Sequence, residues 1–195
     1  PDADCDAVTH LICDTLVVDL SNPKSWYPKH QLLQGLMLQL YQDEALSKVR
    51  ENISVRKVFS DLYESNNIIA NCEKVSYNPP ENKFFKFMGS PLHWDIDFSI
   101  GPRYHIQGLI YLDDVPVERG ALTLIPGFHH RLSDFLRNFD TPDEAIATLR
   151  QTKKIVPLAG KKGDLIVWLE SIPHAASPNQ STVPRFVQYV SFTCH

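Results

Sequence analysis

The stretch GKKGDLIVWLESIPHAASPNQSTVPRFVQYV, residues 160–190, decides the fold of this chain. It contains one apolar run at residues 164–169 and the start of another at 186–193, separated by a segment rich in serine and proline. Short apolar runs bounded by turn-forming residues are typical of β-strands in an all-β domain. The stretch therefore predicts two strands, with His174 following the first and Arg185 opening the second.

The same sequence pattern extends over the chain from residue 71 onward, with short apolar runs separated by turn-forming residues. Further strands are expected at residues 72–77, 92–100, 105–112, 120–125 and 155–157, and a helical insertion at 130–151. A parallel α/β sheet would need a helix between nearly all strands, and the pattern lacks these helices. We therefore expect a mainly β fold with flanking helices, of the cupin-like, double-sheet jelly-roll class.

The first 70 residues show a different pattern. Residues 11–20 form a short apolar stretch, which predicts an edge strand. Leucines recur at roughly helical spacing in residues 30–49 and predict a helix packed on the core. A weaker helix is expected at residues 55–63.

Composition places the chain among ordinary globular proteins. Its 195 residues fit one domain, with a helical and edge-strand part at 1–70 and a jelly-roll core at 71–195. A net charge of −4 without a basic stripe argues against nucleic acid. No apolar run approaches the roughly 18 residues that would indicate a membrane span. The expected partner is therefore a small molecule, and the oligomeric state stays open.

Cysteine usage and the chain ends bear on the compartment. The four cysteines show no CxxC pair and no tight spacing, so reduced thiols in a cytoplasmic protein are preferred over disulfides or zinc. The chain begins at Pro1 without a signal-peptide pattern, and its C-terminus is not a peroxisomal address. We therefore expect a cytoplasmic protein.

His93, Asp95 and His174 suggest a metal site. Side chains two apart on a strand point the same way, so His93 and Asp95 could occupy adjacent corners of an octahedral metal. With His174 they form the ligand set of a non-haem iron(II) site, which leaves positions open for oxygen chemistry. A His-x-Asp pair alone is more often a surface pair or a hydrogen-bonded core histidine. Asp97, on the same predicted strand face, is the alternative carboxylate.

Arg185 is a candidate contact of a co-substrate with a carboxylate tail, and Tyr111 is a second candidate that shares a strand face with Gln107. A guanidinium at the head of the last strand can hold a carboxylate through two parallel hydrogen bonds, although most arginines lie at the surface. Gln107 and Tyr111 share one face of the strand expected at 105–112. If that face looks into the barrel, Tyr111 could contact co-substrate or substrate, and the alternative is a packed core tyrosine.

Several other side chains have two readings. His129 and His130 could contact substrate, but a structural turn is the preferred interpretation. Residues 82–88, which are aromatic and basic, could form a substrate lid or a buried edge strand. Packing roles are expected for Trp94, Trp168 and Phe186.

Four blocks of the sequence together resemble the phytanoyl-CoA dioxygenase (PhyH) family of iron(II)/2-oxoglutarate-dependent oxygenases. The resemblance runs from about Glu73 to the C-terminus. It rests on HWDID at 93–97, QGLIYLDDVP at 107–116, RGALTLIPGFH at 119–129 and the stretch at 160–190. The order of these blocks makes the combined pattern far more specific than any single block.

The resemblance implies a double-stranded β-helix oxygenase that uses iron(II), 2-oxoglutarate and O2 and releases succinate and CO2. It assigns His93, Asp95 and His174 to iron, Arg185 to the distal carboxylate of 2-oxoglutarate, and Gln107 to its neighbourhood. Because related halogenases lack the carboxylate that Asp95 supplies, it implies hydroxylation or a related oxidation of a small organic substrate.

This chain departs from the family pattern at one co-substrate contact. The family often has a polar residue two positions after the distal histidine, and here that position is Ala176. Ser177 or a water could replace the contact. Two rival functions also stay open: a cupin-like metal enzyme without redox chemistry, and a catalytically silent jelly-roll binding module.

Overall fold

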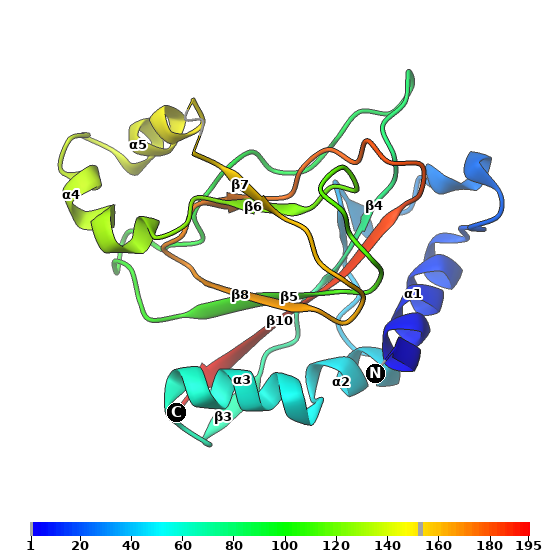
Figure 1. Ribbon diagram of the computed structural model, residues 1–195, viewed down its shortest axis with the longest axis horizontal. Coiled ribbons are helices and arrows are strands. Elements are labelled where there is room, and N and C mark those ends of the chain that lie inside the picture. The colour runs from blue at the N-terminus through cyan, green and yellow to red at the C-terminus, as the bar shows by residue number, and fades with distance from the viewer. Residues whose placement is uncertain (1, 152–153) are drawn as a thin grey trace.

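The computed structural model describes residues 2–151 and 154–195 (Figure 1). Two β-sheets face each other, and helices cover the outer face of the larger sheet and one end of the smaller sheet. The helices are α1 Asp2–Leu16, α2 Glu44–Arg50, α3 Ile53–Tyr63, α4 Leu132–Leu136 and α5 Pro142–Leu149, with 3-10 turns at Pro23–Trp26 and Phe128–Arg131. The strands are β1 Leu33–Gln34, β2 Met37–Leu38, β3 Ile68–Ala70, β4 Val75–Asn78, β5 Ile106–Tyr111, β6 Leu122–Leu124, β7 Val156–Leu158, β8 Leu165–Leu169, β9 His174–Ala175 and β10 Arg185–Cys194.

The larger sheet has the order β1-β2-β4-β10-β5-β8, with β3 paired to the far end of β10, and the smaller sheet has the order β7-β6-β9. All strand pairs are antiparallel. Sequence neighbours such as β5 and β6 lie in different sheets, as in a jelly roll. The predicted mainly β jelly-roll class with flanking helices is confirmed.

Strand β5 shows why both faces of the larger sheet are buried. Ile106 and Ile110 point to the core beneath α1, α2 and α3, whereas Leu109 and Tyr111 point to the core between the two sheets. This alternation follows from the two-residue period of a strand. Gln107 has the same parity as Leu109, so it faces the space between the sheets, where the candidate site lies.

Two predictions for the first 50 residues are wrong. The edge strand expected at 11–20 is instead largely the end of α1, whose buried residues Cys5, Val8, Ile12, Cys13 and Leu16 recur every three or four positions. That spacing is helical and starts before residue 11, outside the stretch that suggested a strand.

The helix expected at 30–49 exists only at its end, as α2. Residues 33–38 form the β1-β2 hairpin, which turns at Gly35. The φ of Gly35 is +61°, a left-handed conformation that glycine adopts without steric cost, and the turn ends the helical pattern of the leucines. The helix expected at 55–63 is confirmed as α3.

Downstream, most predicted strands are present, with one correction at the metal motif. The expected runs at 105–112 and 164–169 correspond to β5 and β8. The strand expected at 92–100 is wrong, because this segment is a loop with a single bridge residue, His93. Strand alternation therefore does not set the direction of the His93 and Asp95 side chains.

Candidate metal centre

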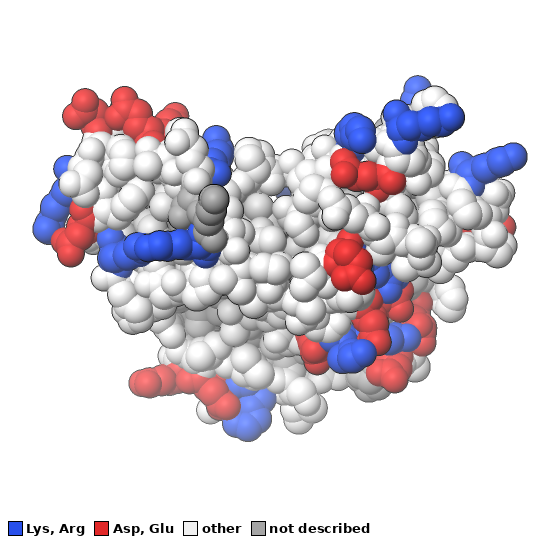
Figure 2. All heavy atoms as spheres, turned by 45° about the horizontal axis from the view of Figure 1, so that its top comes forward, with Lys and Arg blue, Asp and Glu red and all other residues white. Residues whose placement is uncertain are grey.

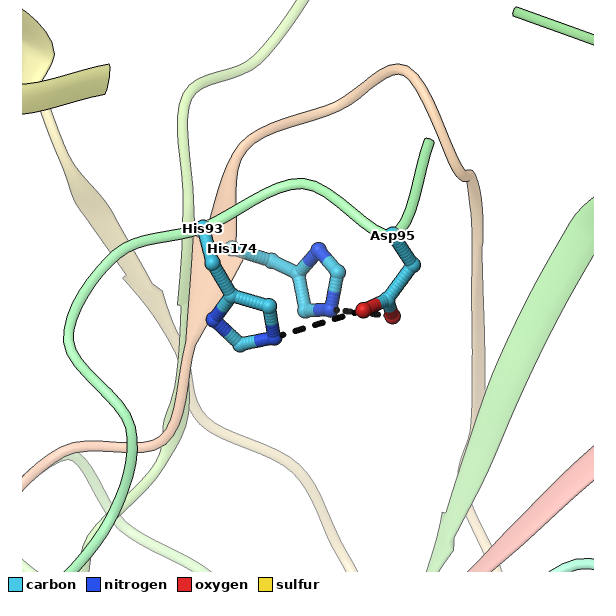
Figure 3. Close-up of side chains that lie close together, drawn as sticks. All are labelled: His93, Asp95 and His174. Carbon is cyan, nitrogen blue, oxygen red and sulfur yellow. Dashed lines mark ion pairs between the residues drawn. The ribbon is translucent and has the colours of Figure 1, made fainter. Parts of the chain in front are cut away.

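His93, Asp95 and His174 converge although two of them lie on a loop (Figure 3). His174 opens β9, and His93 joins it through two backbone hydrogen bonds, His93 N to His174 O at 3.1 Å and His174 N to His93 O at 3.0 Å. One ligand atom from each of the three side chains lies within 4.8 Å of the others. The predicted grouping is present, and the bridge to β9 replaces strand alternation as its cause.

The ring orientation of each histidine is fixed by a contact between its Nδ1 atom and a backbone carbonyl. Nδ1 of His93 lies 2.8 Å from the carbonyl of Pro91, and Nδ1 of His174 lies 3.0 Å from the carbonyl of Ile172. A carbonyl only accepts, so each Nδ1 carries the proton and each Nε2 keeps a free lone pair. These Nε2 atoms lie 3.7 and 3.4 Å from the oxygens of Asp95.

Gln107, which lies on β5, holds the carboxylate of Asp95 in place. Its Nε2 donates to Asp95 Oδ2 at 2.6 Å. Its Oε1 is buried without a hydrogen-bond partner among the described residues. Gln107 therefore contacts a candidate ligand directly, a role that sequence reasoning, which placed it beside the co-substrate, did not anticipate.

The protonation states in this cluster suit a metal. Burial raises the pKa of Asp95, but its contacts with His174 and Gln107 and the nearby His93 hold that pKa well below its usual range. Burial and the neighbouring His174 lower the pKa of His93. Metal ions bind ionised carboxylate and neutral imidazole, and both shifts favour these forms.

The three side chains lie at one wall of a cavity of about 310 Å³ between the sheets. Trp168 and Gln107, which face each other across β8 and β5, also line it, as does Ser191, the partner of Gln107 on β10. This cross-strand row places an aromatic, an amide and a hydroxyl side by side. Sequence reasoning missed Ser191 and also Ser76, on β4, because strand register cannot be read from one strand alone.

Arg185 lies behind the wall of this cavity. It is 1% exposed and opens β10, as expected from the sequence. Its Nη1 donates to the carbonyl of Gly120, and its Nη2 donates at 3.1 Å to Oγ of Ser76, which lines the cavity. Among the described residues, its Nε has no partner and no carboxylate lies within 4.0 Å of its guanidinium.

Tyr111 is placed differently from the other candidates. Its hydroxyl donates to the carbonyl of Leu158 at 2.8 Å and accepts from the backbone N–H of Leu122 at 2.9 Å. The side chain is fully buried in the core between the sheets and is not among the residues that line the cavity. These contacts support the packed-core alternative.

The position that lacks a polar side chain, Ala176, lines the cavity. Ser177 does not replace it, because its hydroxyl donates to the carbonyl of Ala121 at 2.8 Å. Asp97 is exposed and accepts hydrogen bonds from the backbone N–H and the hydroxyl of Ser99, so it does not compete with Asp95. Trp94 packs on Phe128, with the packing role that was expected.

Other sequence candidates stay outside the cavity. His129 and His130 lie in the 3-10 turn Phe128–Arg131, with their ring centroids 3.8 Å apart and their ring planes tilted by 43°. They are absent from the residues that line the cavity, as the structural-turn interpretation expects. The edge strand considered for residues 82–88 is wrong, because this segment is a loop capped by the side chain of Asn82.

The family model for phytanoyl-CoA dioxygenase (PhyH) matches residues 42–187. The chain belongs to this family. A Dictyostelium discoideum protein that carries the name phytanoyl-CoA dioxygenase is 29% identical over 96 residues, which cover 44% of this chain and 26% of that protein. A Stutzerimonas stutzeri protein named as an alpha-ketoglutarate-dependent hypophosphite dioxygenase is 28% identical over 156 residues, or 75% of this chain and 51% of that protein. The matches therefore span about half or less of these relatives.

Solved structures share the fold at low sequence identity. AviO1 from Streptomyces viridochromogenes is 18% identical with a TM-score of 0.67, covering 98% of this chain and 83% of its own. EctD from S. alaskensis with bound Fe is 18% identical with a TM-score of 0.65, covering 97% and 66%. HygX from Streptomyces hygroscopicus, with nickel, 2-oxoglutarate and hygromycin B bound, is 13% identical with a TM-score of 0.56, covering 78% and 66%.

Two further observations concern the whole chain. The four cysteines are free thiols, two buried and two exposed. Among the described residues, no helix combines the length and apolar character that a membrane crossing needs.

Proposed function

We propose that this protein is an iron(II)- and 2-oxoglutarate-dependent dioxygenase that oxidises a small organic substrate. Membership of the PhyH family and the grouping of His93, Asp95 and His174 support this function. When bound, iron(II) and 2-oxoglutarate would activate O2, with 2-oxoglutarate converted to succinate and CO2. The free cysteines support a cytoplasmic setting, and the two facing sheets support one domain over residues 1–195.

The donor set fits iron. Two imidazole Nε2 atoms and one carboxylate lie together at a cavity, and they could hold iron(II) as the 2-His-1-carboxylate set that supports oxygen chemistry. The Pro91 and Ile172 carbonyls fix the imidazoles, and Gln107 fixes the carboxylate. Such outer contacts orient the ligands before a metal binds.

The single observation that carries the co-substrate assignment is the buried, unpaired guanidinium of Arg185. Burying a charge without a counter-ion costs several kcal/mol, so buried arginines are almost always paired. Here the neighbours of the guanidinium are a carbonyl and the hydroxyl of Ser76, both neutral. A dicarboxylate in the cavity would supply the missing negative charge, with one end at the triad and the other near Ser76 and Arg185.

The experiment compares two five-carbon dicarboxylates by calorimetry, under anaerobic conditions and with iron(II) present. 2-Oxoglutarate should bind at one molecule per chain, because its keto acid end would bind the metal while its far carboxylate would lie beside Ser76 and the charge of Arg185. Glutarate lacks the keto group and should bind at least about tenfold more weakly, or about 1.4 kcal/mol. Equal affinity for the two compounds, with iron bound, would contradict the proposal and favour a binding module or a non-redox metal enzyme.

A further inference from the structure

A second cavity, of about 680 Å³, lies beside the metal cavity. Its walls come from two segments of the chain, residues 23–35 and 77–88. Met88 lines both cavities, and Gly35 of the second cavity is flanked in sequence by two residues of the first. The two cavities are therefore neighbours that share Met88 as a wall. Met88 is 53% exposed and has a flexible side chain.

The walls of the second cavity are mainly aromatic rings and prolines. Tyr27 and Phe85 contact each other with ring centroids 5.3 Å apart. Phe84 is 87% exposed, although exposed aromatic rings in a contiguous apolar patch are uncommon in the absence of a ligand or partner. The remaining apolar walls are formed by Pro23, Trp26, Pro28, Leu33, Tyr77 and Pro79.

The polar atoms of these rings are already bonded to the backbone. The Tyr27 hydroxyl donates to the carbonyl of Pro80 at 3.1 Å, and the indole N–H of Trp26 donates to that of Asp19 at 3.0 Å. The Tyr77 hydroxyl donates to the carbonyl of Trp26 at 2.9 Å. These bonds fix the rings in place, so the cavity offers preformed apolar ring surfaces rather than hydrogen-bonding groups.

The charges at this cavity are all positive. Lys24 and Lys29 line it, and Nζ of Lys83 lies 4.7 Å from the ring centroid of Phe84. No Asp or Glu is among the lining residues. Within the described part of the chain, no carboxylate lies within 4.0 Å of the ammonium group of Lys24 or Lys29. The nearby Glu81 accepts a hydrogen bond from the backbone N–H of Phe87.

We propose that this cavity binds the apolar ring system of an organic anion. Apolar faces held in place by backbone hydrogen bonds suit a rigid ring system, and unpaired ammonium groups at their edge suit a negatively charged substituent. The same molecule would reach the metal cavity past Met88, which names a substrate class for the proposed oxygenase. This last step rests on the proposed function, whereas the binding site itself does not.

The basic loop is visible from outside. Residues 82–88 belong to the loop that rises at the upper right of Figure 1. Figure 2 shows that the forward face is hollowed between two raised parts, which carry both basic and acidic side chains, whereas few charged side chains lie on the floor between them.

The test uses two fluorescent probes that differ by one charged group. 8-Anilino-1-naphthalenesulfonate carries a sulfonate, and N-phenyl-1-naphthylamine is the same ring system without it. Both are titrated into the metal-free protein of 195 residues. We expect one sulfonate probe per chain, bound at least about tenfold more tightly than the uncharged probe.

Variants locate the binding. Lys24→Gln combined with Lys29→Gln should weaken the sulfonate probe about tenfold and leave the uncharged probe unchanged, because only ion pairing is lost. Phe84→Ser should weaken both probes, and the exposure of Phe84 keeps the fold intact. Lys48→Gln combined with Lys57→Gln, on α2 and α3, and Ile69→Ser, on β3, are matched controls and should change neither affinity.

The outcomes separate this proposal from the enzyme proposal. Because the probes need neither iron nor 2-oxoglutarate, a protein that fails to bind iron can still confirm the ring-binding cavity. Equal affinity for the two probes, or affinities that the Lys24, Lys29 and Phe84 variants leave unchanged, would overturn the cavity proposal whatever the metal site does.

Discussion

At the scale of single residues, Arg185 has the environment that a ligand would explain best. Its guanidinium is buried beside neutral acceptors, and Nε has no partner among the described residues. We expect Arg185→Lys to weaken 2-oxoglutarate binding at least about tenfold, because an ammonium cannot make two parallel bonds to a carboxylate. Calorimetry on the iron-loaded variant measures this, with the exposed Arg137→Lys as control. Unchanged affinity would remove Arg185 from the co-substrate site.

Gln107 allows a second test, because its contact with Asp95 distinguishes two roles. Gln107→Leu removes the 2.6 Å hydrogen bond while keeping the side-chain volume roughly constant. Loss of such a second contact to a metal ligand should lower iron affinity about 10- to 100-fold. At saturating iron, 2-oxoglutarate affinity should stay within about twofold. The opposite pattern, normal iron affinity with weak 2-oxoglutarate binding, would restore the co-substrate role expected from the family resemblance.

The sequence predicted which residues meet at the site better than why they meet. His93, Asp95 and His174 do converge, but a backbone bridge to β9 brings them together, not the alternation of a strand. The grouping was predictable because the spacing of residue types reflects the chemistry of the metal. The bridge was not, since it joins positions about 80 residues apart and depends on the whole barrel.

At the scale of elements, α1 packs its apolar stripe on the larger sheet, although its end was expected to be a strand. Ile12, at the centre of the stripe, is fully buried. Ile12→Ala should therefore lower the free energy of unfolding by about 2–5 kcal/mol. Urea denaturation measures the change, and Ile53→Ala, at an 83% exposed position, should stay within about 0.5 kcal/mol. Equal effects at the two positions would show that α1 is not packed on the core.

Elements were predictable where local pattern and tertiary role agree. Strands β5 and β8 consist of apolar runs ended by turn residues, and their contacts with the cores on both sides of the larger sheet follow from these runs. The β1-β2 hairpin was missed because its leucines also fit a helix, and only the left-handed turn at Gly35 decides against that helix. A single sequence does not reveal the φ angle of a glycine.

At the scale of the whole molecule, thiol reactivity tests how the helices and sheets are packed. Cys5 and Cys13 are buried in α1, and burial raises the pKa of the Cys13 thiol to about 11. Cys72 and Cys194 are exposed. Ellman's reagent at pH 8 should therefore modify two thiols quickly and the other two only in denaturant, because attack requires an accessible thiolate. Four fast thiols would contradict the packing of α1.

We propose that one cavity of this molecule holds both iron and 2-oxoglutarate. The decisive experiment is an anaerobic titration of the iron(II)-loaded protein with 2-oxoglutarate, followed through the visible charge-transfer absorption of the metal–keto acid chelate. We expect a saturable band at one equivalent, absent in His174→Ala and shifted to much higher 2-oxoglutarate concentration in Arg185→Lys. Absence of the band from a protein with iron demonstrably bound would contradict it.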